Sequence, residues 1–379
     1  MKAIVVGGGV IGATVAYRLA EAGTKVTLVE AGRIAEGTSL TSFAWVSACE
    51  KIDSDSYYRL SLAALEAHRD LVAELGSRGT WYHRPGVIQW LGAGYEGMAL
   101  SEGPVQQKLD RLRALGYPAE AVGPADLARL EPGLRSEALG VGDQAIHYPE
   151  DGYIEAPVMI VALLEAGIER FGLTLRTHTP VRRVLTAHGR ATGVETAAGE
   201  VLSADVVVNC GGRWANEIVG DPGLEIPLAP TLGLIAYTPA VGTAIHKVLR
   251  TPSLNVRADG GGRLLLRAND LDETLSADDT VRPDHPAATE LVRRLGELVP
   301  SLAGIPAEAA RIAVRPIPLG GLPCVGAIPG LADYWVAVTH GGINTSAFIG
   351  VALRDEILAG CAAPEYAPYR PDRFFGVAA

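Results

Sequence analysis

Residues 3–30 of the chain, AIVVGGGVIGATVAYRLAEAGTKVTLVE, follow the pattern of a strand, a glycine turn, a helix, a second turn and a second strand. Two apolar runs with high β propensity, 3–6 and 25–30, enclose the segment 13–22, which is rich in good helix formers. Gly23 follows this segment, at the place where a left-handed residue commonly ends a helix. The stretch therefore predicts a βαβ unit.

Three glycines of this unit, Gly7, Gly9 and Gly12, have the GxGxxG spacing of dinucleotide-binding turns. The first makes the tight turn, the second lets a pyrophosphate approach the backbone, and the third allows the helix to pack closely on the strand. The helix N-terminus at Val10 and Ile11 offers free N–H groups and a positive dipole end to the phosphates. A glycine turn without a ligand is the simpler alternative, but the complete βαβ setting favours a nucleotide.

Glu30 ends the second strand, about 20 residues after the glycine turn. An acidic side chain there accepts hydrogen bonds from both hydroxyls of the adenosine ribose and repels a 2′-phosphate. Ala31 and Arg33 follow it, and we include both in the expected nucleotide site. The unit alone does not separate FAD from NAD, because both cofactors present an ADP half to the same turn.

A polar loop, 31–48, follows the second strand and contains several small hydroxyl side chains. Hydroxyl groups beside a dinucleotide site are suited to hydrogen bonds with a diphosphate and a ribityl chain. The same composition is also typical of an ordinary polar loop. The residues expected to contact the cofactor here are Thr38, Ser39, Thr41, Ser42, Phe43, Ala44 and Trp45.

The composition of the chain restricts the classes of function. Its 379 residues exceed what one core usually supports, which favours two domains of roughly 150–200 residues each. A formal net charge of −10 argues against a nucleic-acid partner, since such proteins use clustered Lys and Arg to neutralise phosphates. The eight histidines show no metal-ligand spacing, so we expect no metal site.

The four cysteines, Cys49, Cys210, Cys324 and Cys361, are far apart and form no CxxC pair. Free thiols in a reducing compartment are the favoured interpretation, so we expect a cytoplasmic protein. The uncharged run 226–245 contains three prolines, each of which would remove a helical hydrogen bond in lipid. We therefore expect no transmembrane segment.

The stretch 151–216 has the pattern of the second half of a flavin-type dinucleotide fold. The expected elements are a helix over 156–171, strands over 173–176, 181–187 and 191–196, and a buried strand over 205–209. The last strand runs into Cys210 and Gly211, and Trp214 follows. Such a glycine-rich strand end is suited to cover the adenosine half of FAD.

A second glycine turn occurs near the C-terminus, where a strand over 334–339 runs into His340, Gly341 and Gly342 and a helix follows over 344–359. NAD enzymes need one such anion site. A flavin benefits from two, because the pyrimidine edge of its ring gains negative charge on reduction. The second turn therefore favours FAD, while an NAD-dependent dehydrogenase and a nonenzymatic nucleotide-binding protein remain the alternatives.

Three separated blocks, GGGVIGATVAYRLAEAGTKVTLVE, VVVNCGGRWAN and LPCVGAIPG with VAVTHGGINTSAFIG, together with YRPDRF, resemble the D-amino-acid oxidase family of FAD-dependent oxidoreductases. The branch that looks most similar comprises glycine oxidase, sarcosine oxidase and D-amino-acid dehydrogenase. The resemblance covers nearly the whole chain and is weakest over about 81–150 and 235–305. It implies an α/β fold: a doubly wound Rossmann-type FAD domain and an α+β substrate domain built on an antiparallel sheet.

The resemblance also implies a division of the chain and a set of cofactor contacts. We expect segments 1–80, 145–225 and 310–379 to form the FAD domain and segments 81–144 and 226–309 to form the substrate domain. Val181 matches the backbone contact to adenine. The adenosine cover matches Cys210, Gly211 and Trp214, and the turn at the flavin pyrimidine edge matches Gly341, Gly342, Ile343, Asn344 and Thr345.

No cysteine stands at the position that binds flavin covalently in sarcosine oxidases, since Cys324 falls in a proline-rich turn. We therefore expect noncovalent FAD. Arg315 matches the arginine that holds the substrate carboxylate, and its place at a strand end before a proline-rich turn would direct it into the active cavity. A structural ion pair with a surface carboxylate is the alternative role for Arg315.

Four further residues are weaker catalytic candidates. Arg257 lies on an expected hairpin of the substrate sheet, as a second anion contact or a solvated strand residue. His340 lies beside the flavin turn, where simple packing is the alternative. Lys51 would face the flavin or be a solvated lysine at a helix start, and Tyr237 is the weak match to the family's carboxylate-binding tyrosine.

The resulting hypothesis is an FAD-dependent amine or amino-acid oxidase or dehydrogenase. It would oxidise the C–N bond of an amino acid or N-substituted glycine by hydride transfer to flavin N5, giving an imine. Hydride transfer requires a neutral amine and a carbon held close to the ring, so a planar guanidinium gripping a carboxylate at two points would supply the orientation. Oxygen or a quinone or other electron carrier would then accept the electrons.

Overall fold

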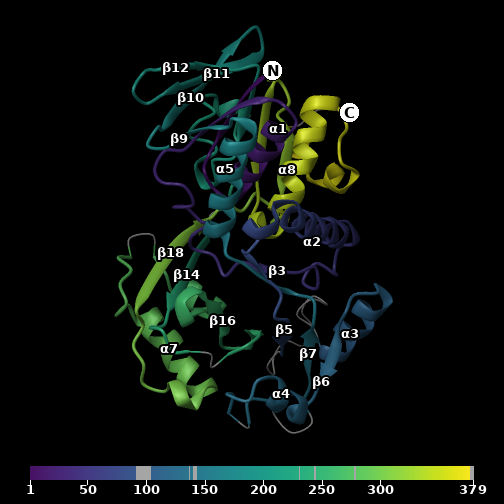
Figure 1. Ribbon diagram of the computed structural model, residues 1–379, viewed down its shortest axis with the longest axis vertical. Coiled ribbons are helices and arrows are strands. Elements are labelled where there is room, and N and C mark those ends of the chain that lie inside the picture. The colour runs from purple at the N-terminus through teal and green to yellow at the C-terminus, as the bar shows by residue number, and fades with distance from the viewer. Residues whose placement is uncertain are drawn as a thin grey trace.

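The computed structural model (Figure 1) describes residues 1–90, 104–135, 137–139, 143–229, 231–242, 245–276 and 279–375. The chain forms two stacked bodies, each built around its own large sheet (Figure 1). The upper body in the figure carries both ends of the chain, and internal segments form the lower body.

The sheet of the upper body has six strands in the order β19-β20-β13-β1-β2-β9. The strands are β1 (Lys2–Val6), β2 (Lys25–Val29), β9 (Thr174–Arg176), β13 (Val206–Asn209), β19 (Cys324–Ala327) and β20 (Tyr334–Val338). Neighbours run parallel except β19, which pairs antiparallel with β20 at the edge. Strand β1 lies inside the sheet, so its glycine turn opens at the carboxyl edge, where α/β folds bind ligands.

Alternate residues of β1 pack into two different cores. Ala3 and Val5 belong to the core beneath the helices, whereas Ile4 and Val6 belong to a core on the opposite face. The helices are α1 (Val10–Glu21), α5 (Ala156–Phe171) and α8 (Gly342–Ala359), and α2 (Asp55–Leu75) packs on α8. Among the residues that the structure describes, no helix has both the length and the apolar character to cross a membrane.

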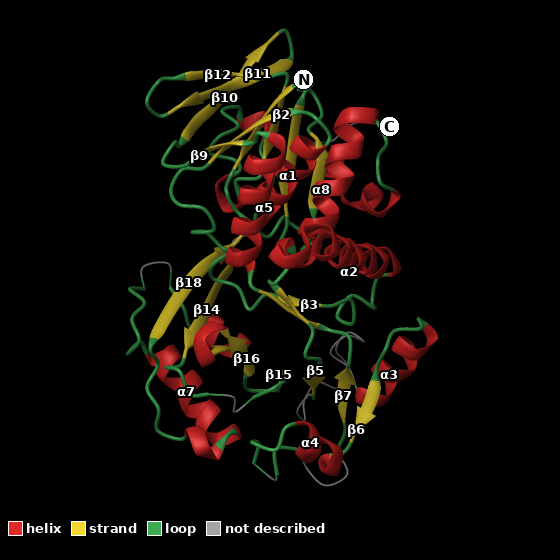
Figure 2. Cartoon of the chain, in the orientation of Figure 1, coloured by secondary structure: helices red, strands yellow, loops and turns green. Residues whose placement is uncertain are grey.

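The opposite face is covered by a three-stranded antiparallel sheet of β10 (Val181–Ala187), β11 (Arg190–Thr196) and β12 (Val201–Ser203). Figure 2 shows this sheet and the helices on the two sides of the central strands. The expected β-meander therefore takes the place of a second helical layer, because Val184 and Val194 supply the apolar cover on that side. The predicted α/β class is confirmed, with helices on one face rather than both.

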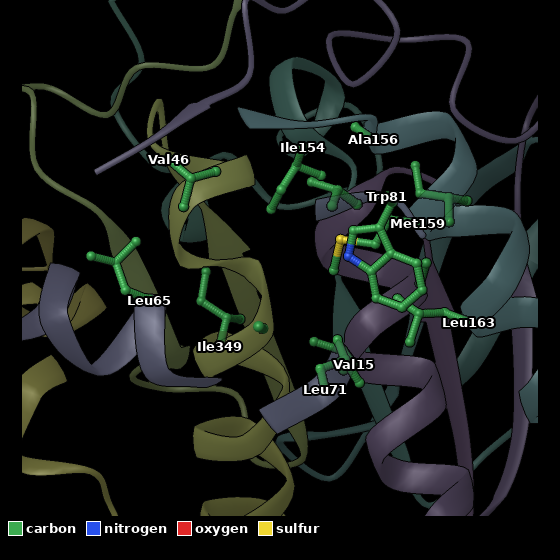
Figure 3. Packing of buried hydrophobic residues seen from close by; sticks show 14 of the residues in the cluster. Val15, Val46, Leu65, Leu71, Trp81, Ile154, Ala156, Met159, Leu163 and Ile349 are labelled. Carbon is green, nitrogen blue, oxygen red and sulfur yellow. The ribbon is translucent and has the colours of Figure 1, made fainter. Parts of the chain in front are cut away.

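The core beneath the helices centres on large side chains from several elements. Trp81 is fully buried. Figure 3 shows Trp81 beside Met159 and Leu163 of α5, with Val15 of α1 and Leu71 of α2 below it. This packing joins the N-terminal βαβ unit to a helix about 140 residues further along the chain, which fixes the orientation of α1.

The sheet of the lower body has eight strands in the order β18-β14-β17-β16-β15-β5-β7-β6. They are β5 (Val87–Gln89), β6 (Glu120–Val122), β7 (Ala145–Tyr148), β14 (Thr231–Tyr237), β15 (Val248–Arg250), β16 (Asn255–Asp259), β17 (Arg263–Arg267) and β18 (Ala309–Arg315). All neighbours are antiparallel except β5 and β15. The helices of this body are α3 (Val105–Ala114), α4 (Pro124–Leu130), α6 (Asn269–Asp272) and α7 (Pro286–Leu298).

A small sheet links the two bodies, formed by β3 (Trp45–Val46), β8 (Gly152–Ile154) and β4 (Tyr82–His83). Sheet membership divides the chain differently from the expected domain segments. Strands β7 and β18 belong to the lower sheet, whereas we had assigned 145–225 and 310–379 to the FAD domain. Parts of 81–144 and 226–309 lie outside the described residues.

Cys324 begins strand β19, so its placement in a proline-rich turn was wrong. The residue is fully buried and pairs with Val338 of β20. The short run Cys-Val-Gly-Ala has enough apolar character to add an edge strand once β20 is in place, which the preceding prolines obscured in the sequence.

We expect Gly12→Ala to lower the free energy of unfolding by about 1–3 kcal/mol, the usual cost of overpacking. A Cβ at this position would overlap the carbonyl oxygen of Gly7, and backbone cannot move aside cheaply. Thermal unfolding of the two proteins measures the difference. Gly123→Ala is the control, since Gly123 has φ −88° and open space around it. Equal stability of the Gly12 variant and the wild type would contradict the close packing.

Candidate active site

A cavity of about 920 Å³ runs from the glycine turn of β1 to one face of the eight-stranded sheet. Its wall comes from segments far apart in sequence: the turn at Gly7, the loop 31–47, the strand end at Cys210 and the turn before α8. Strands β14, β15, β17 and β18 close the other end. The cavity therefore lies at the carboxyl edge of the parallel sheet, as the sequence predicted for the nucleotide.

The first glycine turn is shaped by close backbone approach. Gly7 has φ +110°, and a Cβ there would lie 2.5 Å from the carbonyl oxygen of Cys210. A Cβ on Gly9 would lie 3.2 Å from Ser39 Oγ. The Val10 N–H, at the start of α1, donates to the same Ser39 hydroxyl at 3.0 Å. Gly7, Gly9, Val10 and Ile11 line the cavity, whereas Gly12 lies behind the turn and supports it.

Glu30 lines the cavity at the end of β2. Its carboxylate accepts hydrogen bonds from the Gly8 N–H at 2.6 Å and from the Gly32 N–H at 2.7 Å. Two backbone donors thus fix the orientation of the carboxylate. Ala31 also lines the cavity. Arg33 does not: its side chain is 76% exposed and pairs with Glu36, which is a lining residue.

The loop after β2 follows the cavity wall. All seven loop residues that we expected to contact the cofactor line the cavity: Thr38, Ser39, Thr41, Ser42, Phe43, Ala44 and Trp45. Thr38 Oγ1 donates to the Val314 carbonyl of β18 at 3.0 Å, which ties the loop to the lower sheet. Ala44 has φ +57°, a conformation that costs a non-glycine residue energy.

The residues expected at the adenosine half of FAD and at the second glycine turn lie along the same cavity, with one exception. The cavity is lined there by Val181, Cys210, Gly211, Trp214, Gly341, Gly342, Ile343 and Asn344. Thr345 is fully buried and donates to the Gly341 carbonyl at 3.0 Å, so it supports the turn without lining the cavity. Asn344 Oδ1 accepts from the Ser47 N–H at 3.0 Å, joining α8 to the loop.

Arg315 ends β18 and lines the cavity, where its guanidinium donates to Asp272. Asp272 also accepts from Arg267 at 2.9 Å and from the Leu234 N–H at 2.8 Å. The Arg315 guanidinium lies where a Cβ on Gly233 would be, so the glycine gives it room. Arg315 thus faces the cavity and also makes an ion pair, although with a buried carboxylate rather than a surface one.

Arg250 and Arg267 also line this end of the cavity, and neither was among the expected site residues. The Arg250 guanidinium lies 4.1 Å from the centre of the Trp45 ring and 3.0 Å from Glu50 Oε2. Burial opposes ionisation of Glu50, but Arg250 and Lys108 lower its pKa to about 2. The sequence feature that could have indicated Arg250 and Arg267 is the basic residue at the end of each apolar run, KVLR and RLLLR.

His340 and Lys51 line the cavity near Arg315. Burial, together with the charges of Arg315 and Lys51, lowers the pKa of His340 to about 4, so its ring is neutral at pH 7. Lys51 Nζ lies 4.9 Å from the centre of the Tyr57 ring, another cavity residue. Lys51 is therefore a cavity residue rather than a solvated lysine at a helix start.

Tyr237 and Arg257 line a second cavity of about 210 Å³ and are not among the residues that line the first. Leu265 of β17 pairs with both of them, so the three form one row across β14, β17 and β16. Arg257 is 3% exposed and donates to the Phe43 carbonyl at 2.7 Å. The structure thus does not bring these two candidates to Arg315.

The separation of the two cavities has a simple cause. Asn255, which lines the first cavity, and Arg257, which lines the second, are two residues apart on β16 and share a face of the sheet. Ser39, Ser42 and Ala44 line both cavities, so the cofactor loop passes between them. The sequence predicted the hairpin that holds Arg257, but it did not indicate that the loop after β2 crosses this hairpin.

Comparison with known proteins decides the family. Residues 2–356 match the family described as FAD dependent oxidoreductase. The chain belongs to this family. It is 29% identical to a glycine oxidase of Pseudomonas putida, with 89% of each chain covered. The predicted family is thereby confirmed, and the chain is an FAD-dependent oxidoreductase rather than an NAD-dependent dehydrogenase or a nonenzymatic protein.

Solved structures show the same fold. The crystal structure of glycine oxidase from Geobacillus kaustophilus superposes with a TM-score of 0.83 at 24% identity, covering 97% of both chains. Iminodiacetate oxidase from Chelativorans sp. superposes with a TM-score of 0.82 at 22% identity, covering 97% of this chain and 98% of the other. The cavity is consistent with FAD, since it offers two glycine turns, two helix N-termini and a carboxylate in one continuous space.

We expect Glu30→Ala to weaken FAD binding by about tenfold or more, because charge-assisted hydrogen bonds to the ribose are worth roughly 1.5–3 kcal/mol. Equilibrium dialysis of FAD against each protein measures the change. Glu200→Ala is the control, since Glu200 pairs with Arg176 at the surface. Unchanged FAD affinity in the Glu30 variant would show that its carboxylate serves the backbone amides of Gly8 and Gly32 alone.

Proposed function

We propose that the protein oxidises the C–N bond of an amino acid or N-substituted glycine to an imine. The observation that carries this proposal is Arg315, which faces the same cavity as the two glycine turns and lies on the sheet opposite them. A guanidinium in that place is suited to hold a carboxylate beside the flavin. The oxidised carbon is the one that joins this carboxylate to the amine.

The relatives support the same substrate class. Glycine, named for the Pseudomonas enzyme, and iminodiacetate, named for the Chelativorans enzyme, both carry a carboxylate one carbon from the nitrogen. A site that grips such a carboxylate positions the adjacent C–H and C–N bonds without further contacts. The shared chemistry therefore points to Arg315 as the residue that orients the substrate.

The residues that hold FAD are the two glycine turns, Glu30 and the loop 38–45, and bound FAD supplies the hydride acceptor. Oxidation removes a hydride from the carbon and a proton from the nitrogen. Arg250, Arg267 and Arg315 surround the substrate end of the cavity, so their charges disfavour an ammonium group and favour the neutral amine. Neutral His340 adds no charge there.

Arg315 keeps part of its guanidinium available. Its Nη2 donates one of two hydrogens to Asp272, so the other can still form a two-point contact with a carboxylate, together with the neighbouring N–H of Nη1 or Nε. Asp272 is itself held by Arg267 and the Leu234 amide, so it fixes the plane of the Arg315 group. We further propose that oxygen or a quinone or other electron carrier accepts the electrons and that the protein works in the cytoplasm.

We expect FAD to be released by acid precipitation, so that the yellow colour moves to the supernatant. Among the described residues, Cys210 is the cysteine that lines the cavity, and it lies beside Gly7, at the end that we assign to adenosine. Cys324 is buried in β19 and lines no part of the cavity wall. Absorbance spectra of pellet and supernatant make the test, and colour kept in the pellet would show a covalent flavin.

We expect Arg315→Lys to lower kcat and raise KM, because lysine keeps the charge and loses the two-point grip. Arg315→Ala should lower kcat/KM by about a hundredfold, corresponding to the loss of two hydrogen bonds to a charged group. Steady-state turnover of a reactive amino acid measures both parameters, and anaerobic stopped-flow reduction of the flavin isolates the chemical step. Both variants should stay yellow, since Arg315 is assigned to the substrate.

Gly233→Ala tests the same assignment without changing a charge. Its Cβ would displace the Arg315 guanidinium, so this variant should resemble Arg315→Lys. Gly123→Ala, outside the cavity, should behave like the wild type. Equal rates for an amino acid and its decarboxylated amine would remove Arg315 from this role.

A further inference from the structure

We propose that the substrate carries a second acidic group, bound by Arg250 and Asn255 while Arg315 holds the first carboxylate. This inference rests on the proposed function and narrows its substrate class to dicarboxylic amino acids and N-carboxymethyl amino acids. What these compounds share is a second carboxylate a few bonds from the oxidised C–N bond.

Strand pairing places three polar side chains in one row. Arg250 of β15 pairs with Asn255 of β16, and Asn255 pairs with Arg267 of β17. Directly paired residues share a face of the sheet, and adjacent strands lie about 4.8 Å apart, so the three side chains form a row about 10 Å long. All three line the cavity, and Arg315 lines it as well.

The guanidinium groups of this wall outnumber the described carboxylates that pair with them. The described carboxylates that pair with these guanidinium groups are Glu50, beside Arg250, and Asp272, which Arg267 and Arg315 share. Lys108 also binds Glu50, at 2.5 Å. Burial and the nearby charges of Arg315 and Arg250 lower the pKa of Arg267, so the three groups are close enough to repel one another. Each carboxylate is thus shared between two cations, and added negative charge would stabilise the cluster.

The Arg250 guanidinium is incompletely hydrogen-bonded. Arg250 Nη1 is buried and makes no hydrogen bond within the described structure, although Glu50 Oε2 lies 3.0 Å away. Its guanidinium is held over the Trp45 ring, so its direction is fixed by packing. The ion pair with Glu50 is therefore not aligned as a hydrogen bond, and an oxygen from a ligand could accept from this buried N–H. Asn255 is 6% exposed and lines the same cavity.

A single carboxylate would pair with only some of the polar groups in this row. Arg315 lies at the far end of β18, in register with Thr231, whereas Arg250 lies across three intervening strands. One carboxylate of ordinary size cannot span that distance, since its two oxygens lie about 2.2 Å apart, against about 4.8 Å between neighbouring strands. A substrate with two carboxylates offers acceptors at two separate points along this wall.

Binding without turnover gives the first test. Thiodiacetate has two carboxylates around a sulfur and no amine to oxidise, and (methylthio)acetate is its monoacid counterpart. We expect isothermal titration calorimetry of the FAD-loaded protein to show that thiodiacetate binds at least about tenfold more tightly. Equal affinity of the two compounds would overturn the second-carboxylate site.

Turnover separates the two classes of diacid. Anaerobic flavin reduction is compared for iminodiacetate against sarcosine, and for both enantiomers of aspartate and glutamate against those of asparagine and glutamine. The expected result is a KM at least about tenfold lower for the diacid of one class. Monoacids with an equal or lower KM would overturn this inference and leave the proposed function standing. Failure of every amino acid to reduce the flavin would overturn both.

Variants of the row residues test whether these side chains cause the lower KM for the diacid. Asn255→Ala should raise KM for the diacid by about tenfold while KM for its monoacid counterpart stays within about twofold, and Arg250→Gln should raise KM more for the diacid than for the monoacid. Arg263→Gln is the matched control on the same hairpin, since Arg263 pairs with Asp259 beside the second cavity. Because Arg250 also pairs with Glu50, the Asn255 variant keeps the test decisive if Arg250→Gln does not fold. An equal loss for both acids would show a general effect on the site.

Discussion

The close approach of the first glycine turn to the end of β13 is the constraint on which the rest of the structure depends. Gly7 leaves no room for a Cβ beside the Cys210 carbonyl, and Gly12 leaves none beside Gly7. Because these backbones touch, α1 starts at the edge of the sheet and points its free N–H groups into the cavity. The loop after β2 then has one path along the wall, and Ser39 fixes it to the start of α1.

That loop determines which residues of the lower sheet can meet. It crosses the face of β16 between Asn255 and Arg257, so two positions on one strand face two cavities. Arg250, Asn255 and Arg267 share a space with Arg315, while Tyr237 and Arg257 share a space with the outer side of the loop. Positive charge on the sheet is thereby divided between a site for chemistry and a packing contact under Phe43.

The parts predicted from sequence are those that local spacing determines. The glycines, Glu30 and the turn before α8 each follow from a strand–turn–helix pattern within about 30 residues. Arg250 and Arg267 were missed because their meeting depends on the pairing of β15, β16 and β17, which no local pattern reveals. The same limit explains why β7 and β18 joined the lower sheet and why helices cover only one face of the upper one.

The cavity wall is assembled from the turn at Gly7, the strand end at Cys210 and the start of α8, which are far apart along the chain. A ligand that fills it acts as a reversible crosslink among the three. The unfolded chain cannot present them together, so the folded state alone gains the binding free energy. At free FAD a hundred times its Kd, this gain is about 2.7 kcal/mol. The free energy of unfolding is thus coupled to the supply of flavin.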